Sequence, residues 1–95
     1  MCGIAGYLKK RSNKNNIKKI LDQMNSSQIH RGPNSTNFYI CPEEQAGLVM
    51  CRLSILDLEL GVQPMTSRDG RYTIIFNGTI LNSPDLREEL EKKKY

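Results

Sequence analysis

The chain has 95 residues, of which 38% are hydrophobic and 25% are charged, and its formal net charge at pH 7 is +4. This length and composition predict one small globular domain with a single modest core. No apolar run is long enough for a membrane span or for the core of a signal peptide, so we expect a protein of the cytoplasm that does not enter the membrane.

Three cysteines, Cys2, Cys41 and Cys51, form no CxxC pair, and His30 is the single histidine. An odd number of cysteines without such spacing favours a reducing compartment over a disulfide framework. One imidazole and no ligand spacing indicate that the chain holds no metal ion.

Basic residues gather near the N-terminal end, between Lys9 and Lys19, and again at residues 92–94. Such clusters could contact the phosphates of a nucleic acid or form a solvated face. Because no aromatic residues lie between these lysines to stack on bases, we favour the solvated face and expect no nucleic-acid partner.

The first half of the chain predicts a strand, a helix and a pair of strands. Residues 2–8 form a short apolar strand with two glycines, which we expect to be buried, and the polar residues 9–16 form a loop. Asn15 or Asn16 is the expected N-cap of the helix that follows. The apolar positions of this helix recur at helical spacing: Ile17, Ile20, Leu21 and Met24.

Beyond the helix, residues 30–35 read HRGPNS and predict a turn that ends it, because proline disfavours helical geometry at the residue before it. Residues 36–41 and 48–53 read as strands. The turn-rich residues 42–45 between them predict a hairpin.

The second half predicts a loop at residues 61–70 and a strand at 72–76. The dipeptide Asn77-Gly78 predicts a hairpin turn leading into residues 79–81.

A final helix is indicated by Ser83 as N-cap and Pro84 at its first position. Asp85 lies early in this helix and lysines 92–94 lie late, which is the charge order that the helix dipole favours.

Cys2 follows the initiator methionine directly, in the segment MCGIAGYL. If Met1 is removed, one residue carries both a thiol and a free α-amine, whose ordinary pKa of about 8 suits a general base at neutral pH. The alternative is a small apolar residue that begins a strand.

An acyl-transfer nucleophile also needs oxyanion donors and a group that holds the substrate. Asn77 offers a side-chain amide and Gly78 a backbone N–H, and the absence of a side chain at Gly78 would let a substrate carbonyl approach. The same dipeptide could be a turn alone. Arg52, at the edge of an apolar strand, could bind a carboxylate through two hydrogen bonds or extend into solvent.

Four segments occur in a fixed order: MCGIAGYL, HRGP, RLSILDLELGVQPM and FNGTILN. In this order and at these separations they resemble the N-terminal glutaminase domain of class II glutamine amidotransferases. The RLSI.D segment followed by QPM is most similar to the glutamine-hydrolysing asparagine synthetases. The resemblance covers nearly the whole chain.

The resemblance implies an α+β fold, the N-terminal part of the four-layer α-β-β-α sandwich of N-terminal nucleophile hydrolases, with antiparallel sheets that are incomplete here. Residues 1–95 would form a partial glutamine amidotransferase domain, without a synthetase domain. We interpret the HRGP turn as architecture near the site.

The same resemblance implies the chemistry. Cys2, once Met1 is lost, would attack the side-chain amide of glutamine to give a thioester and ammonia, with its α-amine as the base. Asn77 and Gly78 would bind the oxyanion, and Arg52 would bind the α-carboxylate of glutamine. The pocket would be lined by Leu53, Ser54, Ile55 and Leu56.

Two departures from the family pattern matter. Thr79 stands where relatives usually have glutamate, which weakens a polar contact to the ammonium end of the substrate. The family's aspartate that pairs with this ammonium falls beyond Tyr95. We therefore expect the chain to be a fragment that is poorly active or inactive alone.

The implied partners are L-glutamine and a C-terminal synthetase domain, which would use ATP and magnesium to make asparagine from the ammonia. Two other classes of function stay open: a non-catalytic relative that keeps the scaffold and binds a partner or small molecule, and a basic interaction module. A retained Met1 would favour the former, and salt-dependent nucleic-acid binding would favour the latter.

Overall fold

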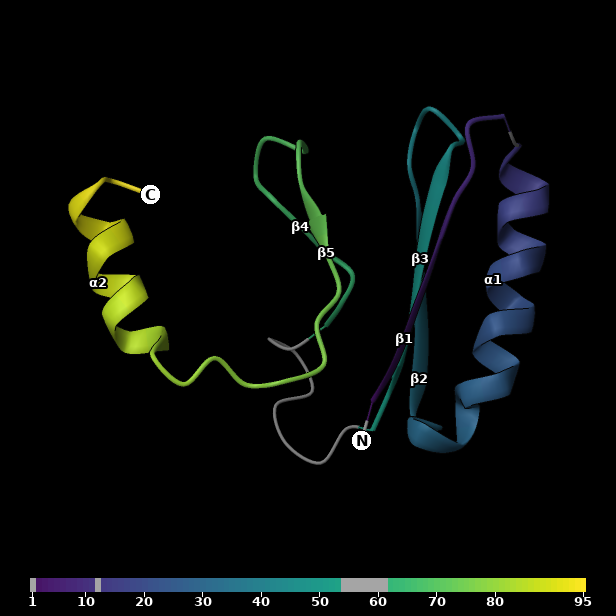
Figure 1. Ribbon diagram of the computed structural model, residues 1–95, viewed down its shortest axis with the longest axis horizontal. Helices are drawn as coiled ribbons and strands as arrows, with labels where there is room; N and C mark the ends of the chain where they lie inside the picture. The colour runs from purple at the N-terminus through teal and green to yellow at the C-terminus, as the bar shows by residue number, and fades with distance from the viewer. Residues whose placement is uncertain (1, 12, 54–61) are drawn as a thin grey trace.

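The computed structural model describes residues 2–11, 13–53 and 62–95, which form the mixed α+β fold expected from the sequence. Helix α1 lies on one side of a three-stranded sheet, and a two-stranded hairpin with helix α2 beyond it lies on the other side (Figure 1). The elements in chain order are β1 (Gly3–Leu8), α1 (Lys14–Gln28), the 3-10 helix η1 (Ile29–Arg31), β2 (Ser35–Ile40), β3 (Ala46–Arg52), β4 (Met65–Thr66), β5 (Thr73–Ile74) and α2 (Ser83–Lys92).

Strand β1 is half-buried, whereas the sequence predicted a buried strand. It runs antiparallel to β3, from Gly3 opposite Cys51 to Leu8 opposite Ala46. Successive side chains of a strand point to opposite faces of a sheet. One face of β1 therefore packs under α1, while the other leaves Ile4 42% exposed.

Helix α1 begins earlier than its apolar spacing indicated, so the prediction of Asn15 or Asn16 as N-cap is wrong. Asn13 has extended backbone geometry, and its side chain accepts a hydrogen bond of 2.9 Å from the N–H of Asn16. This bond satisfies one of the N–H groups that the first helical turn leaves unpaired. A polar cap thus adds a turn before the first buried residue, Ile17.

The core lies between α1 and the sheet. Ile17, Leu21 and Val49 are completely buried there. Gly47 makes this close approach possible, because a Cβ at its position would lie 2.5 Å from Cγ2 of Ile17 and 2.7 Å from Cδ1 of Leu21. Each buried aliphatic side chain contributes about 1.5–3 kcal/mol, so the α1–sheet contact holds this part of the molecule together.

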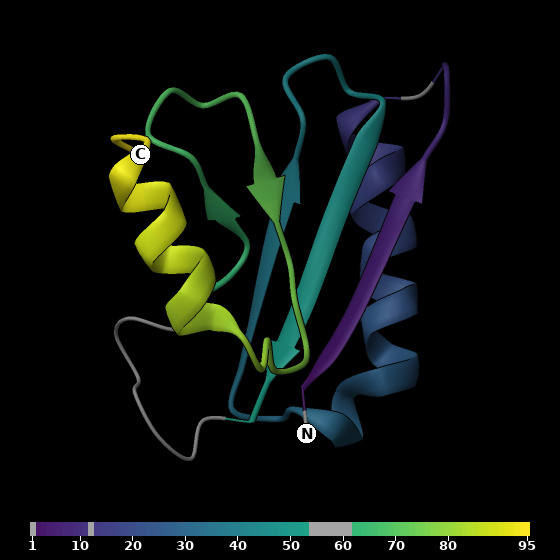
Figure 2. The same ribbon diagram turned by 60° about the vertical axis from the view of Figure 1, so that its left-hand side comes forward.

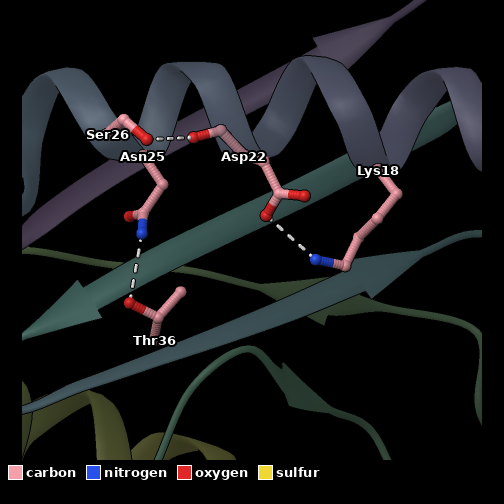
Figure 3. A network of polar contacts seen from close by, with 5 residues as sticks. All are labelled: Lys18, Asp22, Asn25, Ser26 and Thr36. Atoms are coloured by element: carbon pink, nitrogen blue, oxygen red, sulfur yellow. Dashed lines mark hydrogen bonds and ion pairs between the residues drawn. The ribbon is translucent and has the colours of Figure 1, made fainter.

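Polar contacts also join α1 to the sheet and brace its outer face (Figure 3). Asn25, nine-tenths buried, donates from Nδ2 to Oγ1 of Thr36 on β2 at 3.1 Å. On the exposed side, Lys18 pairs with Asp22 one turn later at 3.0 Å. The first contact fixes the C-terminal half of α1 over β2.

The predicted hairpin of residues 36–41 and 48–53 is confirmed, with each strand shifted by one or two residues. Strands β2 and β3 pair antiparallel, from Ser35 opposite Arg52 to Ile40 opposite Gly47. The central position of β3 gives the sheet the order β1-β3-β2.

The second hairpin lies elsewhere than the sequence predicted. Residues 61–70, expected to be a loop, contain β4, and the expected strand 72–76 shortens to β5, which pairs with β4. The turn between them places Gly70 at φ 75°, the one glycine with positive φ in the described parts of the chain. A type I′ turn needs positive φ at both central residues, so Asn77-Gly78 does not form the predicted hairpin turn.

Helix α2 begins one residue earlier than predicted. Asn82, not Ser83, is its N-cap, and Pro84 lies in its first turn. Asp85 near its start and Lys92 near its end confirm the predicted charge order. All residues of α2 are exposed, and the helix lies apart from the sheet (Figure 1).

Figure 2 shows the β4–β5 hairpin across the sheet face opposite α1, with the chain after β5 passing near the N-terminal end of β1. Of the helices in the described ranges, neither α1 nor α2 has the length and apolar character needed to cross a bilayer.

Candidate functional site

Cys2 lies at the start of β1, where three distant segments of the chain meet. Its carbonyl oxygen accepts a hydrogen bond from Nε of Arg31 at 3.1 Å and another from Nδ2 of Asn77 at 2.9 Å. These donors are 29 and 75 residues away in sequence. Two hydrogen bonds to one carbonyl oxygen therefore hold the backbone of the candidate nucleophile.

Arg31 is a contact that the sequence analysis missed, because the whole HRGP segment was interpreted as architecture. It belongs to η1, the tight turn that follows α1 directly. The sequence did contain a signal for this contact: Arg31 is a cation directly before the Gly32-Pro33 turn, where the proline restricts the backbone.

Two glycines let the end of α1 and the η1 turn pack closely against the sheet at this end. A Cβ at Gly32 would lie 2.6 Å from backbone atoms of Cys51 and Arg52, and a Cβ at Gly3 would lie 2.8 Å from Sγ of Cys51 and from Cδ of Gln28. Both positions are buried. The close approach brings Arg31 within reach of the Cys2 carbonyl.

Arg52 ends β3 next to this site. Because Gly3 pairs with Cys51, Cys2 and Arg52 stand one residue beyond that pair on neighbouring strands. Arg52 is only 8% exposed, so it does not extend into solvent, and its carbonyl accepts a hydrogen bond of 3.0 Å from the N–H of Asn34. Arg52 also makes a further interaction within the protein.

Asn77 and Gly78 follow β5 in an irregular, exposed segment. Asn77 reaches Cys2, as described above. Beside Gly78, the space that a side chain would fill holds the ring of Phe76, whose Cζ lies 2.9 Å from the position of a Cβ. The missing side chain at Gly78 therefore makes room for the ring of Phe76.

The remaining predicted pocket residues are only partly placed. Leu53 follows β3 and is 37% exposed, and Thr79 is exposed next to Gly78. Ser54, Ile55 and Leu56 lie outside the described residues. The structure thus brings Cys2, Arg52 and Asn77 to one end of the sheet, with Gly78 and Thr79 next along the chain.

A family model for the glutamine amidotransferase domain matches residues 1–95. The chain belongs to this family.

Individual relatives agree with this assignment. The chain is 42% identical over 97 residues to asparagine synthetase [glutamine-hydrolyzing] 1 of Bacillus subtilis (strain 168), an alignment that covers 100% of the chain and 15% of that protein. It is 36% identical to asparagine synthetase [glutamine-hydrolyzing] 3 of the same strain, over 98% of the chain and 15% of the relative. With asparagine synthetase B [glutamine-hydrolyzing] of Escherichia coli (strain K12) it shares 30% identity over 94% of the chain and 16% of the relative. The chain therefore spans about 15% of the length of the curated relatives it matches. No solved structure matches it.

The other two cysteines of this amidotransferase domain are held differently from Cys2. Cys51 is fully buried and donates its thiol hydrogen to the carbonyl of Gln28 at 3.4 Å. Cys41 lies in the β2–β3 turn at the opposite end of the sheet, where its sulfur accepts hydrogen bonds from the N–H groups of Gln45 and Ala46. Both thiols have structural partners.

The basic cluster of the domain is partly neutralised. The ammonium of Lys18 contacts Asp22 at 3.0 Å and lies 3.6 Å above the ring of Phe38. Within the described residues, no three His, Cys, Asp or Glu side chains are placed to hold a metal ion.

Proposed function

We propose that the chain is the glutamine-hydrolysing part of an asparagine synthetase, with Cys2 as its nucleophile. The observation that carries this proposal is the hydrogen bond from Asn77 to the Cys2 carbonyl. It joins the first residue of the processed chain to the Asn-Gly dipeptide 75 residues later. Thioester chemistry needs a nucleophile and oxyanion donors close together, and these two parts of the chain would supply them.

The proposed reaction begins when the α-amine of Cys2 takes the proton of its own thiol. The thiolate attacks the side-chain carbonyl carbon of glutamine, and the amide oxygen becomes an oxyanion. The amine then returns the proton to the leaving nitrogen, which departs as ammonia and leaves a thioester. Water hydrolyses the thioester to glutamate and regenerates the thiol.

Asn77 and Gly78 are the proposed oxyanion donors. The Nδ2 of an asparagine carries two hydrogens, so the contact with Cys2 leaves one for the oxyanion. Arg52 is the proposed partner of the glutamine α-carboxylate, since it stands beside Cys2 on the neighbouring strand. Leu53, Ser54, Ile55 and Leu56 would line the pocket, and Thr79 would face the ammonium end of the substrate.

The order of layers supports the sandwich fold of N-terminal nucleophile hydrolases. In Figure 1, α1, the three-stranded sheet, the β4–β5 hairpin and α2 follow one another across the molecule. This is the order α-β-β-α. Residues 1–95 would then be a partial glutaminase domain.

The proposed partner is a C-terminal synthetase domain in the cytoplasm, which would consume the ammonia with ATP and magnesium. Neither ATP nor magnesium takes part in the steps proposed for this chain.

The test is glutamine hydrolysis by the full-length protein, measured as glutamate and ammonia, with Cys2→Ala and Cys41→Ala variants. We expect activity in the wild type and Cys41→Ala and none in Cys2→Ala. Activity in Cys2→Ala would remove the nucleophile from the proposal, while an inactive wild type with Met1 retained would favour a non-catalytic scaffold.

A further inference from the structure

Gln63, in the QPM segment, continues the β4–β5 ladder with its side chain. The ladder ends with Met65 opposite Ile74. Its register, continued, places Gln63 opposite Phe76. Because Pro64 has no N–H to donate, the backbone ladder cannot run on unchanged through this position.

The side-chain amide of Gln63 supplies both groups of a paired peptide. The N–H of Phe76 donates to Oε1 at 2.6 Å, and Nε2 donates to the carbonyl of Phe76 at 3.1 Å. A carboxamide offers a donor and an acceptor as a peptide group does, and two residues that exchange both bonds form the standard hydrogen-bonded pair of antiparallel strands. The Phe76 backbone is thereby held on both of its polar groups.

Phe76 directly precedes the proposed oxyanion donors. Asn77, the next residue, reaches the Cys2 carbonyl, and the ring of Phe76 covers Gly78. All residues from 76 to 82 are exposed and lie outside the named strands and helices. The Gln63 contact therefore fixes this irregular segment at its first residue, Phe76.

We propose that Gln63 is a positioning residue for glutamine hydrolysis: by holding the Phe76 backbone, it sets where Asn77 and Gly78 present their N–H groups at Cys2. This inference rests on the proposed function and deepens it.

A purely structural role for Gln63 would be to hold the β4–β5 hairpin together. The same hairpin contains a control for that role, because the hydroxyls of Thr66 and Thr73 form a hydrogen bond of 3.0 Å between its two strands. Thr66→Val removes this bond with little change in shape, and it does so away from Asn77.

The experiment compares Gln63→Met and Thr66→Val in the full-length protein by glutaminase kcat, KM and thermal midpoint. Gln63→Met keeps the length of the side chain and loses both bonds to Phe76. Removing one oxyanion donor outright costs about 100-fold to 1,000-fold in kcat, and we expect its displacement to cost about tenfold. KM should stay within about twofold, since Arg52 still holds the carboxylate. Thr66→Val should keep the kcat of the wild type.

The proposal is overturned if Gln63→Met keeps the kcat of the wild type. It is also overturned if Thr66→Val lowers kcat as much as Gln63→Met does when both variants lose the same thermal midpoint. Should Gln63→Met not fold, Gln63→Glu carries the comparison, because it retains the acceptor for the Phe76 N–H and loses the donor. An inactive wild type, or an active Cys2→Ala, would instead overturn the proposed function itself, and this inference with it.

Discussion

The two halves of the described chain differ in how they are held. From β1 to β3, a core between α1 and the sheet buries Ile17, Leu21 and Val49 completely. From residue 62 to residue 95, not one of the described residues is buried. The candidate site nevertheless draws on both halves, with Cys2 and Arg52 from the first and Asn77 and Gly78 from the second.

This difference shows that the strand of the proposed nucleophile and the segment of the proposed oxyanion donors are held mainly by different interactions. The strand that begins at Cys2, the proposed nucleophile, is placed by apolar packing and by two buried glycines, and hydrogen bonds from Arg31 and Asn77 hold the Cys2 carbonyl. The segment of the proposed oxyanion donors, Asn77 and Gly78, is held by a few directed hydrogen bonds, from Asn77 to Cys2 and between Gln63 and Phe76. Core changes should therefore act on stability, and changes in the second half on chemistry.

The largest expected effect comes from the core. Leu21→Ala should lower the free energy of unfolding by about 2–5 kcal/mol, because it leaves a cavity under α1. Leu86→Ala, on the exposed helix α2, should change it by less than about 0.5 kcal/mol. Urea unfolding of the 95-residue chain measures both. Equal losses would contradict a core confined to the first half.

Asn77→Ala should separate chemistry from stability. We expect glutaminase kcat to fall by about 100-fold or more, since one proposed oxyanion donor and its hydrogen bond to Cys2 are lost. The free energy of unfolding should change by less than about 1.5 kcal/mol, because one exposed hydrogen bond is removed. Steady-state kinetics beside urea unfolding gives both numbers. A kcat within twofold of the wild type would remove Asn77 from the site.

Gly32→Ala tests the close approach of η1 to the sheet. Its new Cβ would meet backbone atoms of Cys51 and Arg52 at 2.6 Å, and forcing such a contact costs about 1–3 kcal/mol.

The matched control for Gly32→Ala is Gly6→Ala, whose nearest neighbour would be the end of the Leu48 side chain at 3.2 Å. We expect Gly6→Ala to cost less than Gly32→Ala in urea unfolding. The reverse order would show that η1 is not pressed against β3.

The smallest expected effect is electrostatic and lies in the β4–β5 turn. The hydroxyl of Ser67 and the N–H of Arg71 donate to Asp69 at 2.7 and 3.1 Å and hold the pKa of that carboxyl below its ordinary value of 3.8. Since the folded pKa is the lower one, the stabilisation of the turn is present above pH 3.8 and is lost as the pH falls through the folded pKa.

Ser67→Ala should therefore raise the pKa of Asp69 towards 3.8, because it removes the main donor. An NMR titration of the Asp69 carboxyl carbon in wild type and variant measures this change. Identical titration curves of wild type and variant would show that Ser67 does not lower the pKa of Asp69.

The first half of the fold could be predicted from the sequence because its signals were local. Helical spacing at Ile17 and Leu21 and the turn at residues 42–45 each lie within a few residues of what they predict. The exact start of α1 could not be predicted in the same way, because three closely spaced asparagines, Asn13, Asn15 and Asn16, can each cap a helix and only Asn13 does so.

The second half was predicted less well because its turn signals compete. Both Asp69-Gly70 and Asn77-Gly78 can form tight turns, and the contact of Asn77 with Cys2, 75 residues away, removes the latter dipeptide from the hairpin. Nothing local encodes such a contact. The resemblance to a known family predicted Cys2, Arg52 and Asn77 as site residues, but it did not indicate the contacts of Arg31 with Cys2 and of Gln63 with Phe76.

The most direct test of Cys2 as a terminal nucleophile is the intact mass of the purified protein, before and after incubation with an electrophilic glutamine analogue, with Cys2→Ala in parallel. The account predicts loss of the Met1 mass and one adduct that Cys2→Ala lacks. Retained Met1, or equal labelling of both proteins through Cys41 or Cys51, would contradict it.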